Sequence, residues 1–182
     1  MPTRRGTLVL IASALGTRAA KAASSRQLAH EARAALRRLY AAQPDARGLG
    51  ERARAILVFP RIVKVGLLLA GGQTGDGVLL AHRKASGFFH LSATSSRPQA
   101  GGQAYSCALF FMNERALACL DQREGWAIGS GSSVVVVDES VAPGLSAASA
   151  TEDVYAFPFS TKGLMAGSGI EGAKISRLTP SA

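Results

Sequence analysis

Positively charged side chains with a helical spacing are the residues of this chain best suited to binding chemistry. Arg26, Arg33 and Arg37 recur at intervals that place them within about 60° of one another on an α-helix, and His30 falls on the same side. Guanidinium groups form paired hydrogen bonds with the oxygens of phosphates and carboxylates. A helix face of this kind therefore suits an anionic ligand or an anionic surface.

The helix that positions these arginines is expected to start at Ser24 or Ser25, either of which can cap it, and to end near Ala42, before Pro44. Its other side is apolar and consists of Leu28, Ala32, Ala35, Leu36 and Leu39. One interpretation is an interfacial helix whose basic face meets anionic lipid head groups. The other is a surface helix packed on the domain core through its leucines. The two are compatible where the basic face alone binds the anion.

The net charge of +9 over 182 residues is unevenly distributed along the chain. Ala23–Lys64 contains nine basic and three acidic residues, a net charge of +6, whereas Val65–Ala182 contains eight basic and nine acidic residues, a net charge of −1. This asymmetry predicts an anion-facing surface in the first part of the chain. Ordinary solvated arginines are the alternative.

Other chemistries find little support, and we expect no enzymatic activity, metal or cofactor. The histidines His30, His82 and His90 have no zinc-binding spacing. The glycines of Gly71–Gly77 match neither a dinucleotide fingerprint nor a phosphate-binding loop, and indicate a tight turn or close backbone packing instead. Aromatic residues make up 6% of the chain and do not alternate with arginines, which argues against a single-stranded nucleic acid partner.

Two pairs of residues lead to further expectations. Asp76 and Asp138 are interpreted as structural residues of turns. The spacing of Cys107 and Cys119 is not that of a metal site. The two residues are expected either to form a disulfide or to be buried free thiols.

Met1–Ala22 has the pattern of a signal peptide. Arg4 and Arg5 precede the apolar run Leu8–Leu15, and Ala20-Lys21-Ala22 supplies a small-x-small cleavage site. Cleavage there removes four of the 21 basic residues and none of the 12 acidic ones, which leaves a net charge of +5. The sequence thus predicts an exported, periplasmic protein. Both a Sec-type and a twin-arginine signal fit, and an uncleaved tail is the alternative.

The fold is expected to be organised around Ala53–Leu80. Ile56–Phe59 and Leu67–Leu69 favour strands, Pro60 is expected to end the first of them, and the glycines separate the second from Val78–Leu80. The segment 82–87 is the predicted hairpin connection. Further strands are expected at Gly87–Ser92, Ala104–Met112, Val134–Val137, Val154–Phe159 and Gly169–Leu178.

Few helices accompany these strands. Asn113 is expected to cap a short helix over Glu114–Leu120, Pro44–Gly50 to form a loop, and Trp126, the only tryptophan, to be largely buried. The predicted class is α+β, with a mainly antiparallel curved sheet or barrel, an N-terminal amphipathic helix and one short additional helix. Long helices do not alternate with the strands, which argues against a doubly wound fold.

Three blocks of sequence resemble the SYLF lipid-binding domain family. The first is Ala53–Leu80, with Ala-Ile-Leu-Val-Phe-Pro-x-Ile-Val-Lys-x-Gly followed by Gly-Gly-x-x-Gly-x-Gly-x-Leu-Leu. The second joins Phe110–Glu114 to Gly125–Gly129, and the third runs from Phe157 to Leu178. The resemblance covers roughly Ala23–Leu178. It departs from the family pattern at Leu67–Leu69, where smaller or more polar residues are usual, and at Thr94–Pro98, which lacks the usual glycine.

The resemblance implies a non-enzymatic domain that binds lipid through an N-terminal amphipathic segment and basic residues. The candidate lipid-binding residues are Arg26, Arg33, Arg37, Arg38, Arg61 and Lys64. Actin binding, known in some members, is not carried over to this chain. The expected partner is an anionic phospholipid membrane surface, met peripherally from the periplasm. The alternatives are an envelope protein-interaction or structural module, with a protein partner or a second copy, and a carrier of a small apolar ligand.

Overall fold

The computed structural model describes residues 8–67, 70–95, 101–137, 151–163, 170 and 172–178. Two helices come first, α1 (Leu8–Ala42) and α2 (Pro44–Arg52). The strands that follow are β1 (Ala55–Leu67), β2 (Ala70–Ala81), β3 (Lys84–Ser95), β4 (Gly101–Phe111), β5 (Trp126–Ala127), β6 (Val134–Val136), β7 (Val154–Gly163) and β8 (Lys174–Arg177). Between β4 and β5 lie α3 (Glu114–Ala118) and the 3₁₀ turn η1 (Cys119–Asp121).

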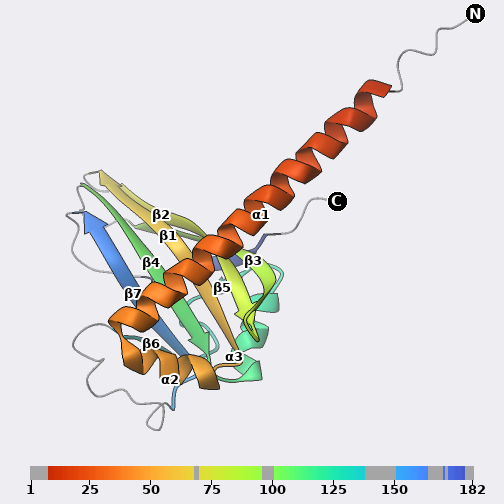
Figure 1. The fold of residues 1–182 in the computed structure, drawn as a ribbon. Helices are drawn as coiled ribbons and strands as arrows, with labels where there is room; N and C mark the ends of the chain where they lie inside the picture. The colour runs from red at the N-terminus through yellow and green to blue at the C-terminus, as the bar shows by residue number, and fades with distance from the viewer. Residues whose placement is uncertain are drawn as a thin grey trace, which may run out of the picture.

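The eight strands in the described part of the chain form one curved sheet in the order β5-β8-β3-β2-β1-β4-β7-β6 (Figure 1). Every pair of neighbours is antiparallel except β6 and β7, which are parallel. The predicted α+β class, with a mainly antiparallel curved sheet, an N-terminal helix and a short additional helix, is therefore confirmed.

The two faces of the sheet bury separate clusters. The face covered by α1 and α2, which we call the helix face, contributes Ile56, Val58, Val78, Leu80 and Phe110 to one cluster. The cluster on the opposite face includes Leu57, Phe59, Phe89, Phe111 and Trp126, together with Ala116 of α3. Alternate residues of β1 point to alternate faces, as the two-residue period of a strand requires.

Helix α1 lies across the helix face and its N-terminal part extends beyond the sheet (Figure 1). Ala32, Ala35 and Leu39 are fully buried against the sheet, and Leu28 and Leu36 are partly buried, which confirms the predicted apolar side. The predicted start is wrong, because the helix begins at Leu8 and both serines lie within it. The alanine-rich sequence before Ser24 has high helix propensity and continues the helix past the two potential caps.

The second helix, α2, occupies the segment predicted as a loop. Pro44 stands at its first turn, where a missing amide costs nothing, and Asp45 faces the positive end of the helix dipole. Ala46 and Leu49 are buried against the sheet. This burial outweighs the low helix propensity of the two glycines, Gly48 and Gly50, that favour a loop in the sequence.

Strand β1 passes through Pro60 instead of ending there. Its register shifts between Val58 and Arg61 relative to β2, so Pro60 lies in a β-bulge. Within a central strand, a bulge is the position where a missing amide is tolerated. The Ser106 hydroxyl of β4 donates a hydrogen bond of 2.8 Å to the Pro60 carbonyl and fixes the bulge.

The glycine-rich segment after β1 is strand β2 and not a turn. A Cβ atom at Gly77 would lie 2.6 Å from the Phe59 ring, and one at Gly75 would lie 2.7 Å from the Arg61 carbonyl oxygen. Close packing, the second interpretation of these glycines, is thus the correct one. Asp76 lies in the same strand and is not a turn residue, whereas Asp138 is outside the described residues.

The remaining expectations for the core hold. Trp126 is fully buried and its indole N–H donates a 2.8 Å hydrogen bond to the Ser130 carbonyl. Cys107 and Cys119 are buried free thiols, and burial raises the pKa of the Cys107 thiol to about 12. Asn113 caps α3 by accepting a 2.8 Å hydrogen bond from the Ala116 amide.

Candidate functional site

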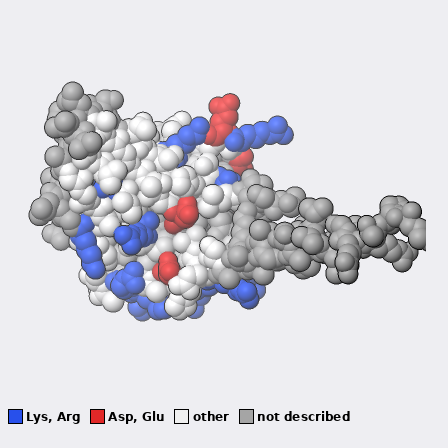
Figure 2. Space-filling model, turned by 90° about the horizontal axis from the view of Figure 1, so that it is seen from above, with Lys and Arg blue, Asp and Glu red and all other residues white. Residues whose placement is uncertain are grey.

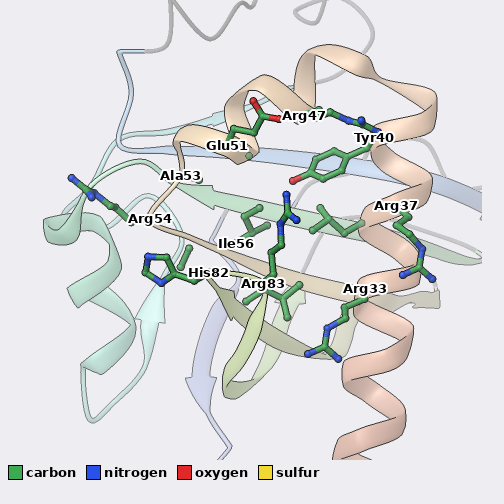
Figure 3. A pocket seen from close by; sticks show the side chains of 14 residues that line it. Arg33, Arg37, Tyr40, Arg47, Glu51, Ala53, Arg54, Ile56, His82 and Arg83 are labelled. Atoms are coloured by element: carbon green, nitrogen blue, oxygen red, sulfur yellow. The ribbon is translucent and has the colours of Figure 1, made fainter.

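A pocket of about 690 Å³ opens on the helix face, where α1, α2, the start of β1 and the turn between β2 and β3 meet (Figure 3). Its floor is apolar and includes Leu36, Ile56 and Leu80. Its walls carry five arginines, Arg33, Arg37, Arg47, Arg54 and Arg83, together with Tyr40, Glu51 and His82. The excess of guanidinium groups over carboxylates gives this pocket a strongly positive character.

Helix geometry accounts for the α1 side of the pocket. Arg33, Arg37 and Tyr40 are three or four residues apart and therefore lie on one face of α1, beside the stripe that packs on the sheet. Arg33 and Arg37 are exposed, so their charges remain solvated. Among the described residues no carboxylate forms an ion pair with either of them.

The opposite wall comes from the tight turn between β2 and β3. His82 and Arg83 both have positive φ, 49° and 65°, the two-residue hairpin conformation for which Asn-Gly is the preferred sequence. A left-handed backbone at two consecutive non-glycine residues is strained. In Figure 3 the Arg83 side chain points from this turn toward Tyr40, across the pocket from Arg33 and Arg37.

Tyr40 lies at the end of the pocket nearest α2, where the absence of a side chain at Gly50 leaves room for its hydroxyl. A Cβ atom at Gly50 would overlap the Tyr40 hydroxyl. The Arg47 guanidinium carbon lies 5.8 Å from the centre of the Tyr40 ring, within cation–π range. Burial raises the pKa of the Tyr40 hydroxyl, although Arg47 and Arg83 act in the opposite direction. The hydroxyl therefore remains a neutral hydrogen-bond donor at physiological pH.

Arg54 contributes less to the pocket than its position suggests. Its side chain points away from Arg83 and from α1 in Figure 3, and its guanidinium lies 3.7 Å from the Glu114 carboxylate at the start of α3. Four arginines, from α1, α2 and the β2–β3 turn, are left to face the pocket.

The six residues predicted as lipid ligands divide among different parts of the surface. Arg33 and Arg37 line the pocket. Arg26 and Arg38 are exposed on α1 outside it, and Arg61 is exposed at the bulge of β1. In Figure 2 many Lys and Arg side chains lie along the left and lower edges of the view, and others lie at the top beside acidic side chains.

Lys64 does not join this basic surface. It follows Ile62, a buried residue of the opposite face, by two positions, and therefore points away from α1 and α2. Its neighbours in the register are Gln73 on β2 and Gln103 on β4, both buried. The Tyr105 hydroxyl donates a 2.7 Å hydrogen bond to Gln73. Lys64 thus belongs to a polar row on the far side of the sheet.

Sequence reasoning missed Tyr40, Arg47, His82 and Arg83. His82 and Arg83 fell in a segment interpreted only as a connection, and Arg47 in one interpreted as a loop. The available signal was the dipeptide His82-Arg83 between two apolar runs, at a spacing that fits a two-residue hairpin turn.

A second polar group lies on β2 and β3, apart from the residues that line the pocket. His90 Nδ1 lies 2.7 Å from Asp76 Oδ1, and its Nε2 lies 3.2 Å from Thr74 Oγ1. All three side chains are at least partly exposed. Asp76 and His90 are therefore a cross-strand side-chain pair between β2 and β3.

Two further findings concern metals and membranes. Across the described part of the chain, no group of three His, Cys, Asp or Glu side chains is arranged to hold a metal ion. Over the same residues, no helix has the length and apolarity needed to cross a bilayer.

Comparison of the sequence with protein-family models and with curated proteins found no match.

Proposed function

We propose that this protein is a non-enzymatic lipid-binding domain of the SYLF type, which associates with anionic phospholipid surfaces through the face that carries the arginine pocket. The observation that carries the proposal is that Arg33, Arg37, Arg47 and Arg83 line one pocket that also has an apolar lining. Guanidinium forks suit phosphate oxygens, and the leucine and isoleucine floor suits the apolar part of the same molecule. An amphipathic ligand fits this combination better than a small inorganic anion does.

The charge distribution supports the same proposal. Half of the excess of +6 in Ala23–Lys64 lies on α1, where Arg26, Arg33, Arg37 and Arg38 stand against Glu31, whereas α2 carries two basic and two acidic residues. Each basic residue close to an anionic bilayer contributes about 1 kcal/mol before salt screening. A few such residues give reversible, salt-sensitive adhesion.

The setting of this activity is proposed from the N-terminal sequence. A signal peptide over Met1–Ala22 would deliver the domain to the periplasm, where it would meet the membrane peripherally. Mass spectrometry of the protein recovered from the periplasm is expected to find an N-terminus near Ala23. A full-length cytoplasmic product alone would contradict export.

The lipid-binding proposal is tested by removing charge from the α1 face. The variant Arg26→Gln/Arg33→Gln/Arg37→Gln keeps helix propensity nearly constant. Its affinity for vesicles containing phosphatidylglycerol is expected to fall by about two orders of magnitude at low salt, if each charge contributes about 1 kcal/mol. Vesicles of phosphatidylcholine alone should bind weakly before and after the change.

A matched control separates this face from net charge in general. The variant Arg38→Gln/Arg52→Gln/Arg123→Gln removes three charges at exposed positions that do not line the pocket. It should retain most of the binding. Equal losses in both triple variants would show that only the total charge matters, and unchanged binding in the first would remove the α1 face from the site.

Salt-insensitive binding of a protein partner would favour the interaction module, and an apolar ligand co-purifying in a one-to-one ratio would favour the carrier.

A further inference from the structure

We propose that Val65, near the end of the β1–β2 hairpin, enters the apolar layer beneath the head groups of an anionic bilayer and gives the protein a second membrane contact, remote from the pocket. This inference rests on the proposed function and deepens it, because it states how the domain is oriented on the surface. It concerns a hairpin in which the sequence departs from the SYLF pattern, at Leu67–Leu69.

Val65 is the most exposed large hydrophobic side chain in the described part of the chain, at 57%. Its partners across the sheet are Gly72 on β2 and Gly102 on β4, so neither residue directly opposite it has a side chain. The next residue along β1, Gly66, is also paired with a glycine on each side. The sheet therefore leaves this valine uncovered by its neighbours.

The glycine at position 102 is required neither by packing nor by the backbone. A Cβ atom there would have one neighbour, the Lys64 carbonyl oxygen at 4.0 Å, which is ordinary van der Waals contact. Its φ also lies outside the left-handed region. Glycine weakens the interior of a strand and often marks a place where another body approaches closely. At Gly102 the missing side chain keeps Val65 accessible.

Val65 faces the side of the sheet that carries α1. Ile62 is buried on the opposite face, and alternation over the next three residues places Val65 on the helix face. Ile56, near the other end of β1, lines the pocket. Nine residues of strand separate the two contacts by roughly 30 Å. In Figure 1, β1 passes beneath α1 and the hairpin continues beyond it, so the helix face has one proposed contact toward each end of this strand.

The charges around the hairpin favour an anionic bilayer as the surface that meets Val65. The described residues at this end of the sheet, 62–67, 70–75, 92–95, 101–105 and 160–163, include Lys64 and Lys162 and no Asp or Glu. Asp76, the next carboxylate along β2, lies 2.7 Å from His90 Nδ1. An apolar side chain accompanied by positive charge suits the boundary between acyl chains and anionic head groups.

The first test places a fluorescent reporter at position 65. Trp126 is the only tryptophan and is fully buried, so the parent protein supplies the blank. With vesicles of phosphatidylcholine and phosphatidylglycerol, the emission of Val65→Trp is expected to shift to shorter wavelength and to be quenched by phosphatidylcholine brominated on its acyl chains. Leu178→Trp, at the other exposed large hydrophobic position of the described residues, should show neither change.

Conservative substitutions then measure what the apolar side chain contributes. Val65→Thr keeps the shape and the strand propensity but replaces a methyl group by a hydroxyl, so affinity for the same vesicles should fall about fivefold. Gly102→Thr keeps the valine but covers one side of it, and should also weaken binding. Leu178→Thr is the matched control and should bind as the parent does. Circular dichroism and the thermal midpoint of each variant verify that it is folded.

The outcomes separate this inference from the proposed function. Vesicle binding without a spectral shift or quenching at position 65, and with full affinity in Val65→Thr, overturns the inference and leaves lipid binding standing. Insertion at position 65 with equal affinity for pure phosphatidylcholine retains the contact and overturns the proposed preference for anionic surfaces. A spectral shift that grows with protein concentration without vesicles assigns Val65 to a contact with a second copy and overturns the inference. Absence of vesicle binding overturns both.

Discussion

At the scale of single residues, the contact between Tyr40 and Gly50 decides the shape of the pocket. The Tyr40 hydroxyl occupies the space that any side chain at position 50 would need, and the Tyr40 ring also faces Phe110 at a centroid distance of 6.5 Å. Glycine is therefore required at position 50 because a side chain there would overlap Tyr40, and not because of its backbone conformation. This contact packs α2 against Tyr40 of α1.

Gly50→Ala is predicted to destabilise the protein by about 1–3 kcal/mol, the usual range for overpacking a well-filled site. Chemical denaturation would measure the change. Tyr40→Phe in the same background removes the overlapping oxygen and should recover part of the loss. If the double variant is no more stable than Gly50→Ala alone, the hydroxyl is not the source of the overlap.

Trp126 is the residue on which the opposite face of the sheet most depends. Its ring is fully buried and lies 5.7 Å from the Phe111 ring, centre to centre. Trp126→Ala is predicted to cost about 3–5 kcal/mol, as truncations of large buried aromatic residues do. The thermal midpoint should fall accordingly, and an unchanged midpoint would contradict the burial.

At the scale of elements, the β2–β3 turn combines poor backbone propensity with a side chain directed at the site. Both positions of a two-residue turn with positive φ favour Asn-Gly, yet this chain has His82-Arg83. Such conflicts between local preference and observed structure concentrate where function is selected. Stability and binding are therefore expected to respond in opposite directions when the turn is idealised.

The variant His82→Asn/Arg83→Gly is predicted to be more stable by about 1–2 kcal/mol, because it relieves two strained residues. Its binding to anionic vesicles should weaken, since Arg83 is removed from the pocket. His82→Asn alone serves as the control that keeps the arginine. A double variant that binds as well as the parent would show that the turn has no part in the site.

The start of α3 is joined to the β6–β7 region through Asp153. Its carboxylate accepts hydrogen bonds from the Asn113 side chain at 2.7 Å and from the Ser133 amide at 3.1 Å. The bond from Asn113 is the main reason that the pKa of Asp153 lies below its ordinary value of 3.8, and the Ser133 amide adds to it. The carboxylate thus stabilises the folded state in its charged form.

Because the folded-state pKa of Asp153 is lowered, its contribution is fully present above the unfolded value near 3.8 and is lost as pH falls below it. Urea denaturation of the parent and of Asp153→Asn is therefore predicted to show a stability difference at pH 6 that narrows between about pH 4 and pH 2. A difference that stays constant over this range would mean that the carboxylate charge is not what these hydrogen bonds stabilise.

At the scale of the whole molecule, the proposed binding surface and the hydrophobic core are built by different faces of the same stretch of α1. Where its side chains are described, the fully buried residues are Ala32, Ala35 and Leu39, all in the second half of the helix. The basic face lies along the same stretch. The predicted cleavage site after Ala22 precedes both.

A chain lacking Met1–Ala22 is therefore predicted to keep its stability and its binding to anionic vesicles. Its thermal midpoint should match that of the full-length protein within a few degrees, since the buried contacts described for α1 are retained. Vesicle affinity should fall only slightly despite the loss of four basic residues. A large loss of either property would assign a structural or binding role to the first 22 residues.

The sequence by itself determined the features that depend on local periodicity and composition. The 3.6-residue period placed Arg33 and Arg37 on one side of α1 and its leucines on another. Asn113 before Glu114 predicted the capped helix, and the many short apolar runs predicted the antiparallel class. These properties follow from interactions between residues close in the chain.

Only the tertiary structure decided which charges share a site. Arg83 joins Arg33 and Arg37 because β2 and β3 meet in a turn beneath α1, a contact between segments far apart in the sequence. Strict alternation along β1 would place Lys64 on the helix face with Val58. The bulge at Pro60 adds a residue and reverses the alternation, so Lys64 points to the opposite face and Arg61 to the helix face.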